Sequence, residues 1–310
     1  MKGLVVKNTG SWYIVKNDVG ELVNCKIKGN FRIKGIRTTN PIAVGDIVTI
    51  TEGDEDSSFI TAIDQRKNYI IRRASNLSKE SHIIGANIDR AFLIIALKNP
   101  ITSTTFIDRF LASAEAYRIN VVIVINKTDL LNTEEMEYCN AVKYLYESIG
   151  YKVLTVSAKN GTGITELSAL TSNNTSLFSG NSGVGKSTII NSLLPGLELR
   201  TSDISTTHHT GMHTTTFSEM FQLPQGGYII DTPGIKGFGT IDFKNGEVAH
   251  YFPEIFKVSH ECRYNNCTHT HEPNCAVLKA VEDHLISESR YASYISILED
   301  NSDNKYRKPY

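Results

Sequence analysis

The chain contains the stretch Gly180-Asn181-Ser182-Gly183-Val184-Gly185-Lys186-Ser187, which Thr188 follows. It fits the phosphate-binding loop pattern G-x-x-x-x-G-K-[ST], in which glycines let successive backbone N–H groups surround a phosphate chain and the lysine neutralises the outer phosphates. Thr175 to Phe178 have the composition of a short strand before the loop, and Ser187 to Leu194 that of a helix whose N-terminus faces the phosphates. We therefore predict a bound nucleotide whose phosphates contact residues 180–188.

Two continuous apolar runs precede this loop, Ala91 to Leu97 and Val121 to Ile125. Such runs are typical of strands that are buried on both faces of a parallel sheet. Between them, residues 106–119 carry apolar side chains at helical spacing, so we expect a crossover helix there. The pattern predicts the βαβ architecture of an α/β nucleotide-binding domain.

Two polar motifs follow strands of this domain and indicate the base. Asn126-Lys127-Thr128-Asp129 comes after the second run; the Asp129 carboxylate can accept hydrogen bonds from guanine N1 and N2, which adenine cannot supply, while the Asn126 amide and the Lys127 stem brace the ring. A later strand, Tyr151 to Val156, ends in Ser157-Ala158-Lys159, where a backbone N–H is expected to meet guanine O6. Open α/β sheets bind ligands at the carboxyl ends of their strands, so these motifs predict GTP.

Two further segments follow the phosphate loop. Thr210 to Thr216 is a polar segment that we expect to order around the γ-phosphate, with a hydroxyl of Thr215 or Thr214 joining that of Ser187 on Mg²⁺. Tyr228 to Ile230 leads as a strand into Asp231-Thr232-Pro233-Gly234. This is the D-x-x-G pattern, in which the aspartate holds the metal through water and the N–H of Gly234 senses the γ-phosphate.

Residues 1–68 have the pattern of a small barrel, because short strand-like runs alternate with turn residues. Cationic residues gather from Lys26 to Arg37, and Trp12, Tyr13 and Phe31 are candidates for stacking on bases. This surface fits either RNA binding or a solvated cationic edge that discourages strand pairing. Arg72 to Asn76 is expected to be a polar connection out of the barrel. The five runs are Leu4–Lys7, Ser11–Lys16, Leu22–Lys28, Asp46–Thr51 and Phe59–Ile63.

A cluster of metal-ligand residue types lies near the C-terminus. Cys262, Cys267 and Cys275 with one histidine offer three thiolates and an imidazole, the ligand set of a closed structural zinc site. Spacing alone permits either His269 or His271 as the fourth ligand. After the cluster we expect a helix with an inward apolar stripe of Ala276, Val277, Ala280, Val281, Leu285 and Ile286.

The composition is that of a soluble globular chain of 310 residues, with 40% hydrophobic and 21% charged residues. No apolar run approaches the length of a membrane span, and the N-terminus lacks the apolar region of a signal peptide, so we expect a cytoplasmic protein. A net charge of −1 means that any RNA contact must depend on local basic patches. The isolated Cys25 and Cys139 are expected to be core residues.

The order of the nucleotide motifs is unusual. GTPases normally present the phosphate loop, switch threonine and D-x-x-G before N-K-x-D and S-A-K, whereas here the last two come first, as in a circularly permuted domain. With the leading barrel and the trailing Cys/His cluster, the chain resembles the circularly permuted ribosome-assembly GTPases, and specifically the small-ribosomal-subunit-dependent GTPase A (RsgA/YjeQ) family. The resemblance is carried by Asn126–Asp129, Gly180–Thr188, His213–Thr216, Asp231–Gly234 and the Cys262–Cys275 cluster.

The resemblance implies an α/β fold in three parts: an OB-fold barrel over residues 1–68, a circularly permuted P-loop GTPase domain over 69–240 and a helical zinc-binding module over 241–310. It also implies hydrolysis of GTP to GDP and phosphate with Mg²⁺, and one structural Zn²⁺ held by Cys262, Cys267, His269 and Cys275. Its further implications are docking on the small ribosomal subunit, contact with 16S rRNA and a role late in subunit maturation. We expect a monomer with no membrane partner.

Ile235 stands where Ras-like proteins carry a glutamine that orients the attacking water, and its side chain cannot hydrogen-bond. His213, beside the switch threonines, is the candidate for that task, as the corresponding histidine is in the proteins that the chain resembles; the alternative is an exposed loop histidine. Lys186 is the other candidate catalytic residue. Two rival functions are an RNA-binding scaffold with a structural nucleotide and a P-loop ATPase or kinase, against which Asp129 argues.

Overall fold

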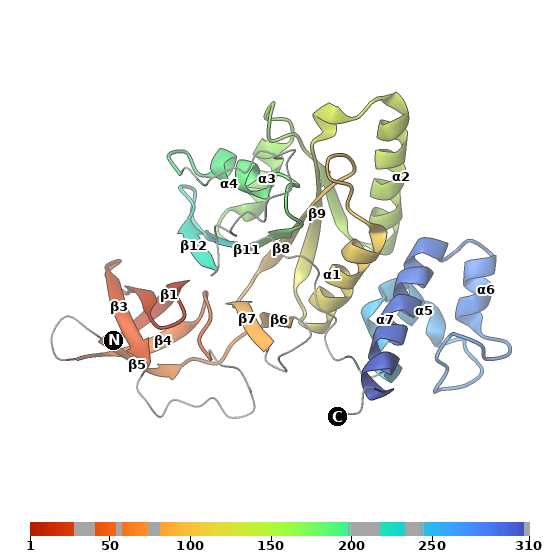
Figure 1. Cartoon of the computed structure of the whole chain (residues 1–310), viewed down its shortest axis with the longest axis horizontal. Helices are drawn as coiled ribbons and strands as arrows, with labels where there is room; N and C mark the ends of the chain where they lie inside the picture. The colour runs from red at the N-terminus through yellow and green to blue at the C-terminus, as the bar shows by residue number, and fades with distance from the viewer. Residues whose placement is uncertain are drawn as a thin grey trace.

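The computed structural model describes residues 1–27, 41–53, 58–73, 81–197, 199, 218–232, 243 and 245–306, with the backbone alone at 72–73, 81–82, 245 and 301–306. Three parts follow one another along the chain (Figure 1): a strand-rich part at the left, a sheet flanked by helices in the centre and a helical module at the right.

The first part is a closed five-stranded barrel. Its strands are β1 (Lys2–Asn8), β2 (Tyr13–Asn17), β3 (Leu22–Ile27), β4 (Ile47–Glu52) and β5 (Ser58–Ile63). They pair in the order β1-β2-β3-β5-β4, and a further β1–β4 pairing closes the ring. Alternate side chains point inward, as the pleat of a strand requires, and form a separate core that includes Val5, Val15 and Ile60. The barrel and its five strands are therefore confirmed.

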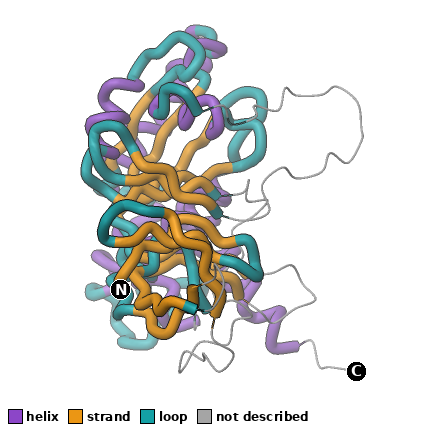
Figure 2. Tube along the Cα trace, turned by 90° about the vertical axis from the view of Figure 1, so that its left-hand side faces the viewer, coloured by secondary structure: helices purple, strands orange, loops and turns teal. Residues whose placement is uncertain are grey.

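The central part contains a parallel sheet of five strands in the order β10-β9-β8-β11-β13. These are β8 (Arg90–Ala96), β9 (Asn120–Asn126), β10 (Lys152–Thr155), β11 (Thr175–Gly180) and β13 (Tyr228–Asp231). The short β12 (Glu219–Gln222) is antiparallel to β13 and also pairs with β1 of the barrel. One eleven-stranded sheet thus runs from the nucleotide domain into the barrel. In Figure 2 the strands of the nucleotide domain lie above those of the barrel.

Helices cover both faces of the parallel strands. α1 (Thr104–Ala116) and α2 (Thr133–Ile149) share one core with the sheet, while α3 (Ile164–Thr171) and α4 (Lys186–Leu193) share the other. The expected helices before β9 and after the phosphate loop are present, whereas α2 and α3 were not predicted. α2 is sharply bounded, because Asn132 and Glu135 form a capping box at its start and Gly150 adopts a left-handed conformation at its end.

The expected polar connection at Arg72 to Asn76 is wrong for its first two residues. Arg72 and Arg73 end β6 (Tyr69–Arg73), which pairs antiparallel with β7 (Ser81–Ala86) in a separate two-stranded sheet. The reason is that Ile70 and Ile83 on this hairpin are buried, so packing outweighs the polarity of the two arginines. Residues 74–76 lie outside the described part of the chain.

The third part packs η2 (Asn245–Tyr251), α5 (Pro253–Ser259), α6 (Ala276–Glu282) and α7 (Glu288–Tyr306) around a core of their own. The helix expected after Cys275 is present, and its Val277 and Ala280 are buried. Leu285 was expected to face inward, but it is 77% exposed. The helix ends at Glu282 and His284 adopts a left-handed conformation, so Leu285 leaves the helical stripe.

The two cysteines outside the C-terminal cluster lie in hydrophobic cores. Cys25 and Cys139 are both fully buried, as expected. Among the helices that the structure describes, none combines the length and apolar character needed to cross a bilayer.

Candidate functional site

The phosphate loop leaves the end of β11 and enters α4, and its glycines are required by close contacts. A Cβ atom at Gly180 would collide with the carbonyl oxygen of Ile94 on β8. Gly185 has a φ of +91°, and a Cβ atom there would collide with the side-chain nitrogen of Asn126. The loop can therefore hold this path only with glycine at these two positions.

Asn126 joins three of the predicted motifs. Its side-chain N–H donates to the carbonyl oxygen of Val184 in the phosphate loop at 2.9 Å, and its side-chain oxygen accepts from the N–H of Ala158 at 3.1 Å. Asn126 is only 3% exposed. These hydrogen bonds hold the phosphate loop and the Ser157-Ala158-Lys159 loop together, and contact of the amide with a guanine ring stays a prediction.

The Asp129 carboxylate is oriented by the same loop. The hydroxyl of Ser157 donates to its Oδ1 at 2.6 Å, and the hydroxyl of Thr128 donates to the carbonyl of Val156 at 3.0 Å. Ser157 is fully buried while Lys159 is exposed. These contacts fix one carboxylate oxygen and leave the carboxylate with further acceptor capacity for N–H donors.

Asn99 and Pro100, which sequence reasoning did not select, form another wall of this region. The ammonium of Lys127 donates to the carbonyl of Asn99, and burial lowers the pKa of Lys127 although Asp129 opposes that change. A Cβ atom placed on Gly183 would lie 3.4 Å from Cδ of Pro100. The Asn99-Pro100 pair, three residues after the end of the buried strand β8, was the sequence signal of a loop at this strand end.

Lys186 and Asp231 form a buried ion pair between α4 and β13. The lysine also donates to the carbonyl of Thr232, whose hydroxyl donates to the carbonyl of Phe178 at 2.8 Å. Burial raises the pKa of Asp231, Lys186 opposes the rise and Glu219 adds to it. The carboxylate of Asp231 and the hydroxyl of Ser187 at the start of α4 are hard oxygen donors, which is the ligand type that Mg²⁺ takes.

Several predicted site residues lie outside the described part of the chain. They are His213, Thr214, Thr215 and Gly234. The described site residues belong to four segments that meet at the carboxyl ends of β9, β10, β11 and β13: Asn126 to Asp129, Ser157 to Lys159, residues 180–188 and Asp231.

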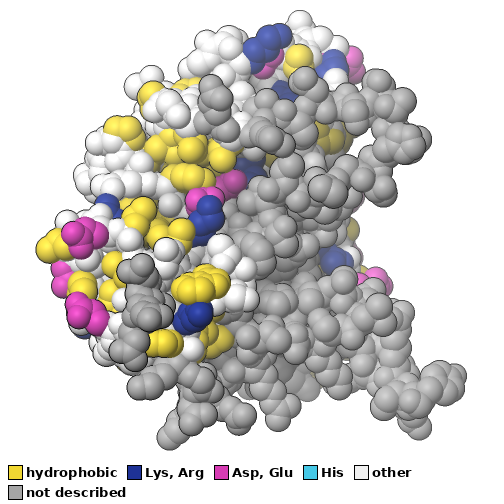
Figure 3. All heavy atoms as spheres, turned by 60° about the vertical axis from the view of Figure 1, so that its left-hand side comes forward, with side chains coloured by type: hydrophobic (Ala, Val, Ile, Leu, Met, Phe, Trp, Pro, Cys, Tyr) yellow, Lys and Arg dark blue, Asp and Glu magenta, His cyan; other side chains and the backbone are white. Residues whose placement is uncertain are grey.

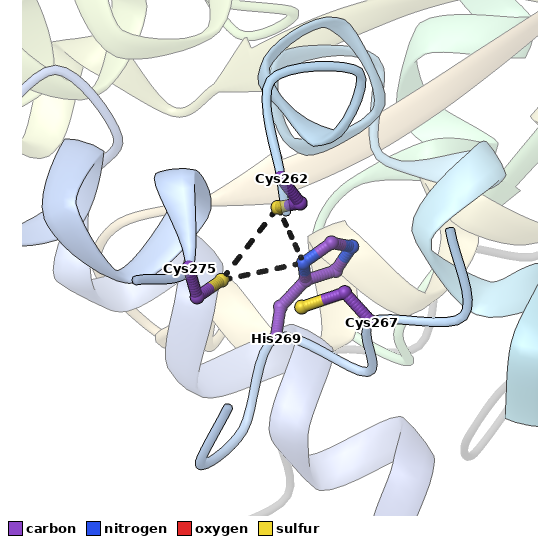
Figure 4. A group of neighbouring side chains, drawn as sticks. All are labelled: Cys262, Cys267, His269 and Cys275. Atoms are coloured by element: carbon purple, nitrogen blue, oxygen red, sulfur yellow. Dashed lines mark hydrogen bonds between the residues drawn. The ribbon is translucent and has the colours of Figure 1, made fainter. Parts of the chain in front are cut away.

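The side chains of Cys262, Cys267, His269 and Cys275 converge on one point in the C-terminal module (Figure 4). Its four ligand atoms lie within 4.8 Å of one another. Sγ of Cys262 is 3.8 Å from Sγ of Cys275, and each of these sulfurs is 3.5 Å from Nδ1 of His269. A tetrahedral Zn²⁺ about 2.3 Å from sulfur and about 2.1 Å from nitrogen gives separations of about 3.8 and 3.5 Å. The cluster therefore fits a structural zinc site.

The structure decides between the two candidate histidines. His269 is 3% exposed inside the cluster, whereas His271 is exposed and its Nδ1 contacts the hydroxyl of Thr270 at 2.8 Å. Burial lowers the pKa of His269, which favours the neutral imidazole that a metal requires. His269 is thus the ligand in the described arrangement.

The loop that carries His269 is held from two sides. Tyr291 and Tyr294 on α7 donate to the carbonyls of His269 and Thr268, each at 2.8 Å. The Glu272 carboxylate accepts from the N–H groups of Thr268 and Thr270. Although partial burial works the other way, these hydrogen bonds hold the pKa of Glu272 well below its usual range. Helix α7 and the metal loop therefore form one unit.

The proposed aromatic surface of the barrel is partly wrong. Tyr13 is 1% exposed in the barrel core, so its ring cannot stack on a base. Trp12 is 38% exposed, and the ammonium of Lys26 lies 4.1 Å from its ring centre. Phe31 and the cationic residues from Lys28 to Arg37 lie outside the described residues. Trp12 and Lys26 are what remains of this surface in the described part.

Comparison with known proteins decides the family. The family model for the RsgA GTPase matches residues 63–241, and the model for the RsgA N-terminal domain matches residues 2–60. The chain belongs to the RsgA GTPase family. It is 61% identical to the small ribosomal subunit biogenesis GTPase RsgA 2 of Bacteroides thetaiotaomicron and 61% identical to RsgA of Bacteroides fragilis, with full coverage of both chains in each case.

Solved structures of the family have the same architecture. The crystal structure of YjeQ from Thermotoga maritima matches with a TM-score of 0.78 and 33% identity, covering 99% of each chain. YloQ, described as a circularly permuted GTPase, matches with a TM-score of 0.74 and 28% identity, covering 100% of this chain and 96% of its own. The expected circular permutation is therefore confirmed, and the protein is a GTP hydrolase of this family.

Proposed function

We propose that this protein acts late in the maturation of the small ribosomal subunit, binding the subunit and its 16S rRNA in a manner that depends on the bound guanine nucleotide. Binding of a guanine nucleotide is supported by the hydrogen bonds of Asn126. They hold the phosphate loop and the Ser157-Ala158-Lys159 loop beside the Asp129 carboxylate. The names of the Bacteroides relatives support the ribosomal part.

In this proposal the base site selects guanine. Asp129, oriented by Ser157, accepts from guanine N1 and N2, Lys127 and Thr128 line the ring, and backbone N–H groups near Ala158 and Lys159 face O6. Replacing Asp129 with asparagine removes a negative acceptor and adds a donor, so we expect GTP affinity to fall at least tenfold while ATP affinity does not rise. Competition of GTP and ATP against a fluorescent GDP analogue measures both, and equal affinities for ATP and GTP in the native protein would contradict guanine selection.

The phosphate site would hold Mg²⁺ between Ser187, Asp231 and Thr215 or Thr214, and the metal when bound neutralises charge on the β- and γ-phosphates. Lys186 is paired with Asp231 in the structure, so it must exchange that carboxylate for the phosphate oxygens as nucleotide binds. Backbone N–H groups of residues 180–188 surround the phosphates, and that of Gly234 senses the γ-phosphate.

For the chemical step we propose His213 as the residue that orients water, because Ile235 cannot. Replacing His213 with alanine should slow hydrolysis and leave GTP affinity within twofold of the native value. Single-turnover hydrolysis in the presence of small subunits checks this, since an unchanged rate would remove His213 from the mechanism.

We further propose that the barrel of residues 1–68 and the zinc module of residues 241–310 supply the RNA contacts on either side of the GTPase domain of residues 69–240. We also propose that the protein acts in the cytoplasm, on ribosomal subunits, and that it acts as a monomer. Because the D-x-x-G segment leads into the zinc module, phosphate loss can reorient an RNA-binding surface.

The decisive experiment measures the GTPase rate with and without purified small subunits, and subunit affinity with a GTP analogue and with GDP. We expect stimulated hydrolysis and a difference in affinity between the two nucleotides. Equal affinities would mean that there is no coupling free energy between nucleotide and subunit. Absence of stimulation together with tight RNA binding would favour a scaffold whose nucleotide is structural.

A further inference from the structure

A row of charged residues crosses the junction between the barrel and the GTPase domain. In the sheet register, Lys7 on β1 lies directly opposite Glu219 on β12, and Glu219 lies directly opposite Asp231 on β13. Directly opposite residues of neighbouring antiparallel strands project from the same face of a sheet. The three side chains therefore form one row on the face that α4 covers, where Lys186 meets Asp231.

The charges along this row alternate only in part. Glu219 and Asp231 are neighbouring carboxylates, and like charges directly opposite each other in a sheet are destabilising. Lys7 compensates on the barrel side, where its Nζ lies 2.9 Å from Oε1 of Glu219, and Lys186 compensates on the nucleotide side. In the view of Figure 3, basic and acidic side chains adjoin at the waist between the barrel and the nucleotide domain.

Lys186 is also the residue that the phosphates require, so it cannot remain the partner of Asp231 once nucleotide is bound. In the nucleotide-bound protein, Lys7 remains as the partner of Glu219 in this row. The Lys7 and Glu219 side chains are 38% and 33% exposed, so their pair is accessible to solvent and to anions at the surface. The barrel thus contributes a charge two strands from Asp231.

We propose that Lys7 of the barrel is a positioning residue for the magnesium site, because by neutralising Glu219 it sets the negative potential that Asp231 presents to Mg²⁺. This inference rests on the proposed function, in which Asp231 holds the metal. Removal of Lys7 leaves Glu219 uncompensated and strengthens Mg²⁺ binding. Removal of the Glu219 charge weakens it, and once that charge is absent Lys7 has no carboxylate through which to act.

The test is the Mg²⁺ concentration that half-saturates the binding of a fluorescent GDP analogue, measured on the full chain. We expect Lys7→Met to lower this concentration and Glu219→Gln to raise it, each by about two- to fivefold, the range of one cross-strand charge pair. The double variant should match Glu219→Gln alone. Both shifts should shrink in high salt, because the pair is partly exposed.

Lys16→Met is the matched control. Lys16 is a barrel lysine that contacts the same strand, with its Nζ 2.6 Å from Oε1 of the uncharged Gln222 and farther along β12 from Asp231. We expect this variant to leave the Mg²⁺ requirement unchanged. A loss of stability at the junction would move Lys7→Met and Lys16→Met together, and that result would overturn the inference.

Asp231→Asn separates failure of the inference from failure of the proposed site. If Asp231→Asn raises the Mg²⁺ requirement while Lys7→Met and Glu219→Gln do not shift it in opposite directions, the link from the barrel is wrong and the site stands. If Asp231→Asn leaves the requirement unchanged, the assignment of Asp231 to the metal is wrong, and the inference falls with it.

Discussion

Asn126 is the last residue of β9, and its side chain forms hydrogen bonds with two other loops of the protein. One hydrogen bond goes to the carbonyl of Val184 and another comes from the N–H of Ala158, so one buried amide connects segments that lie far apart along the chain. Contact of Asn126 and its neighbours with the base stays a prediction. A residue predicted from its motif to contact the ligand thus also joins two loops of the predicted site.

Replacing Asn126 with alanine should reduce the affinity for both GTP and GDP by at least tenfold. The change leaves the buried carbonyl of Val184 and the partly buried N–H of Ala158 without these partners, at a cost of about 1–3 kcal/mol for the buried group. Titration with a fluorescent GDP analogue measures the affinity, and thermal unfolding measures the stability. Asn160→Ala is the control, because Asn160 lies exposed in the same loop and its side-chain oxygen accepts from the N–H of the nearby Thr162. Similar losses in both variants would contradict the bridging role.

At the scale of elements, the metal loop depends on partners that its own sequence does not contain. The four ligands come from the segment between α5 and α6, while the tyrosines that hold the loop come from α7. Cys262, Cys267 and Cys275 also contribute to the apolar core of the module. We therefore expect loss of the metal to loosen the whole module and not the loop alone.

Thiol labelling tests this dependence. In the metal-loaded protein we expect little reaction of any of the five cysteines, and after treatment with a strong chelator we expect three to react: Cys262, Cys267 and Cys275. Cys25 should remain unreacted until the chain unfolds, because it is fully buried and burial raises the pKa of its thiol to about 11. Mass spectrometry after alkylation counts the modified sites. Labelling of Cys25 before Cys262 would contradict the expected order.

A buried arginine connects the zinc module to helix α1 of the GTPase domain by hydrogen bonds and ion pairs. Arg290 on α7 is 1% exposed and donates to Asp108 on α1 at 2.8 Å and to Glu254 on α5 at 2.6 Å. Its guanidinium lies 4.6 Å from the ring centre of Phe252. Burial raises the pKa of Asp108, and the positive charge of Arg290 opposes that rise. The module is therefore joined to α1 as well as through the chain that follows the D-x-x-G motif.

Arg290→Met should destabilise the protein by about 3–5 kcal/mol, because it leaves Asp108 and Glu254 without their buried partner. Chemical denaturation measures this loss. Arg109→Met is the control on the neighbouring position of α1: Arg109 reaches α7 at Ser296 and Asp300, but its side chain is 23% exposed, and we expect a loss below about 1 kcal/mol. Equal losses for the two variants would show that the buried network does not join the domains.

Short motifs in the sequence predict the chemistry and the order of the three parts. Glycines at fixed spacing, a carboxylate after a buried strand and closely spaced cysteines are local patterns, so the phosphate loop, the guanine motif and three cysteine ligands for zinc could be predicted without coordinates. Buried runs such as Ala91 to Leu97 were equally readable, since burial on both faces leaves a continuous apolar signature.

The contacts that those residues make depend on the three-dimensional fold. Several features depend on neighbours that are distant in sequence. They are the strand conformation of Arg72, the burial of Tyr13, the position of His269 and not His271 in the cluster, and the hydrogen bonds of Asn126. The row from Lys7 to Asp231 is of the same kind, because the register of paired strands is set by packing between domains and leaves no local pattern. Short stretches of sequence specify which chemical groups a motif contains, whereas contacts between distant residues depend on how the whole chain folds.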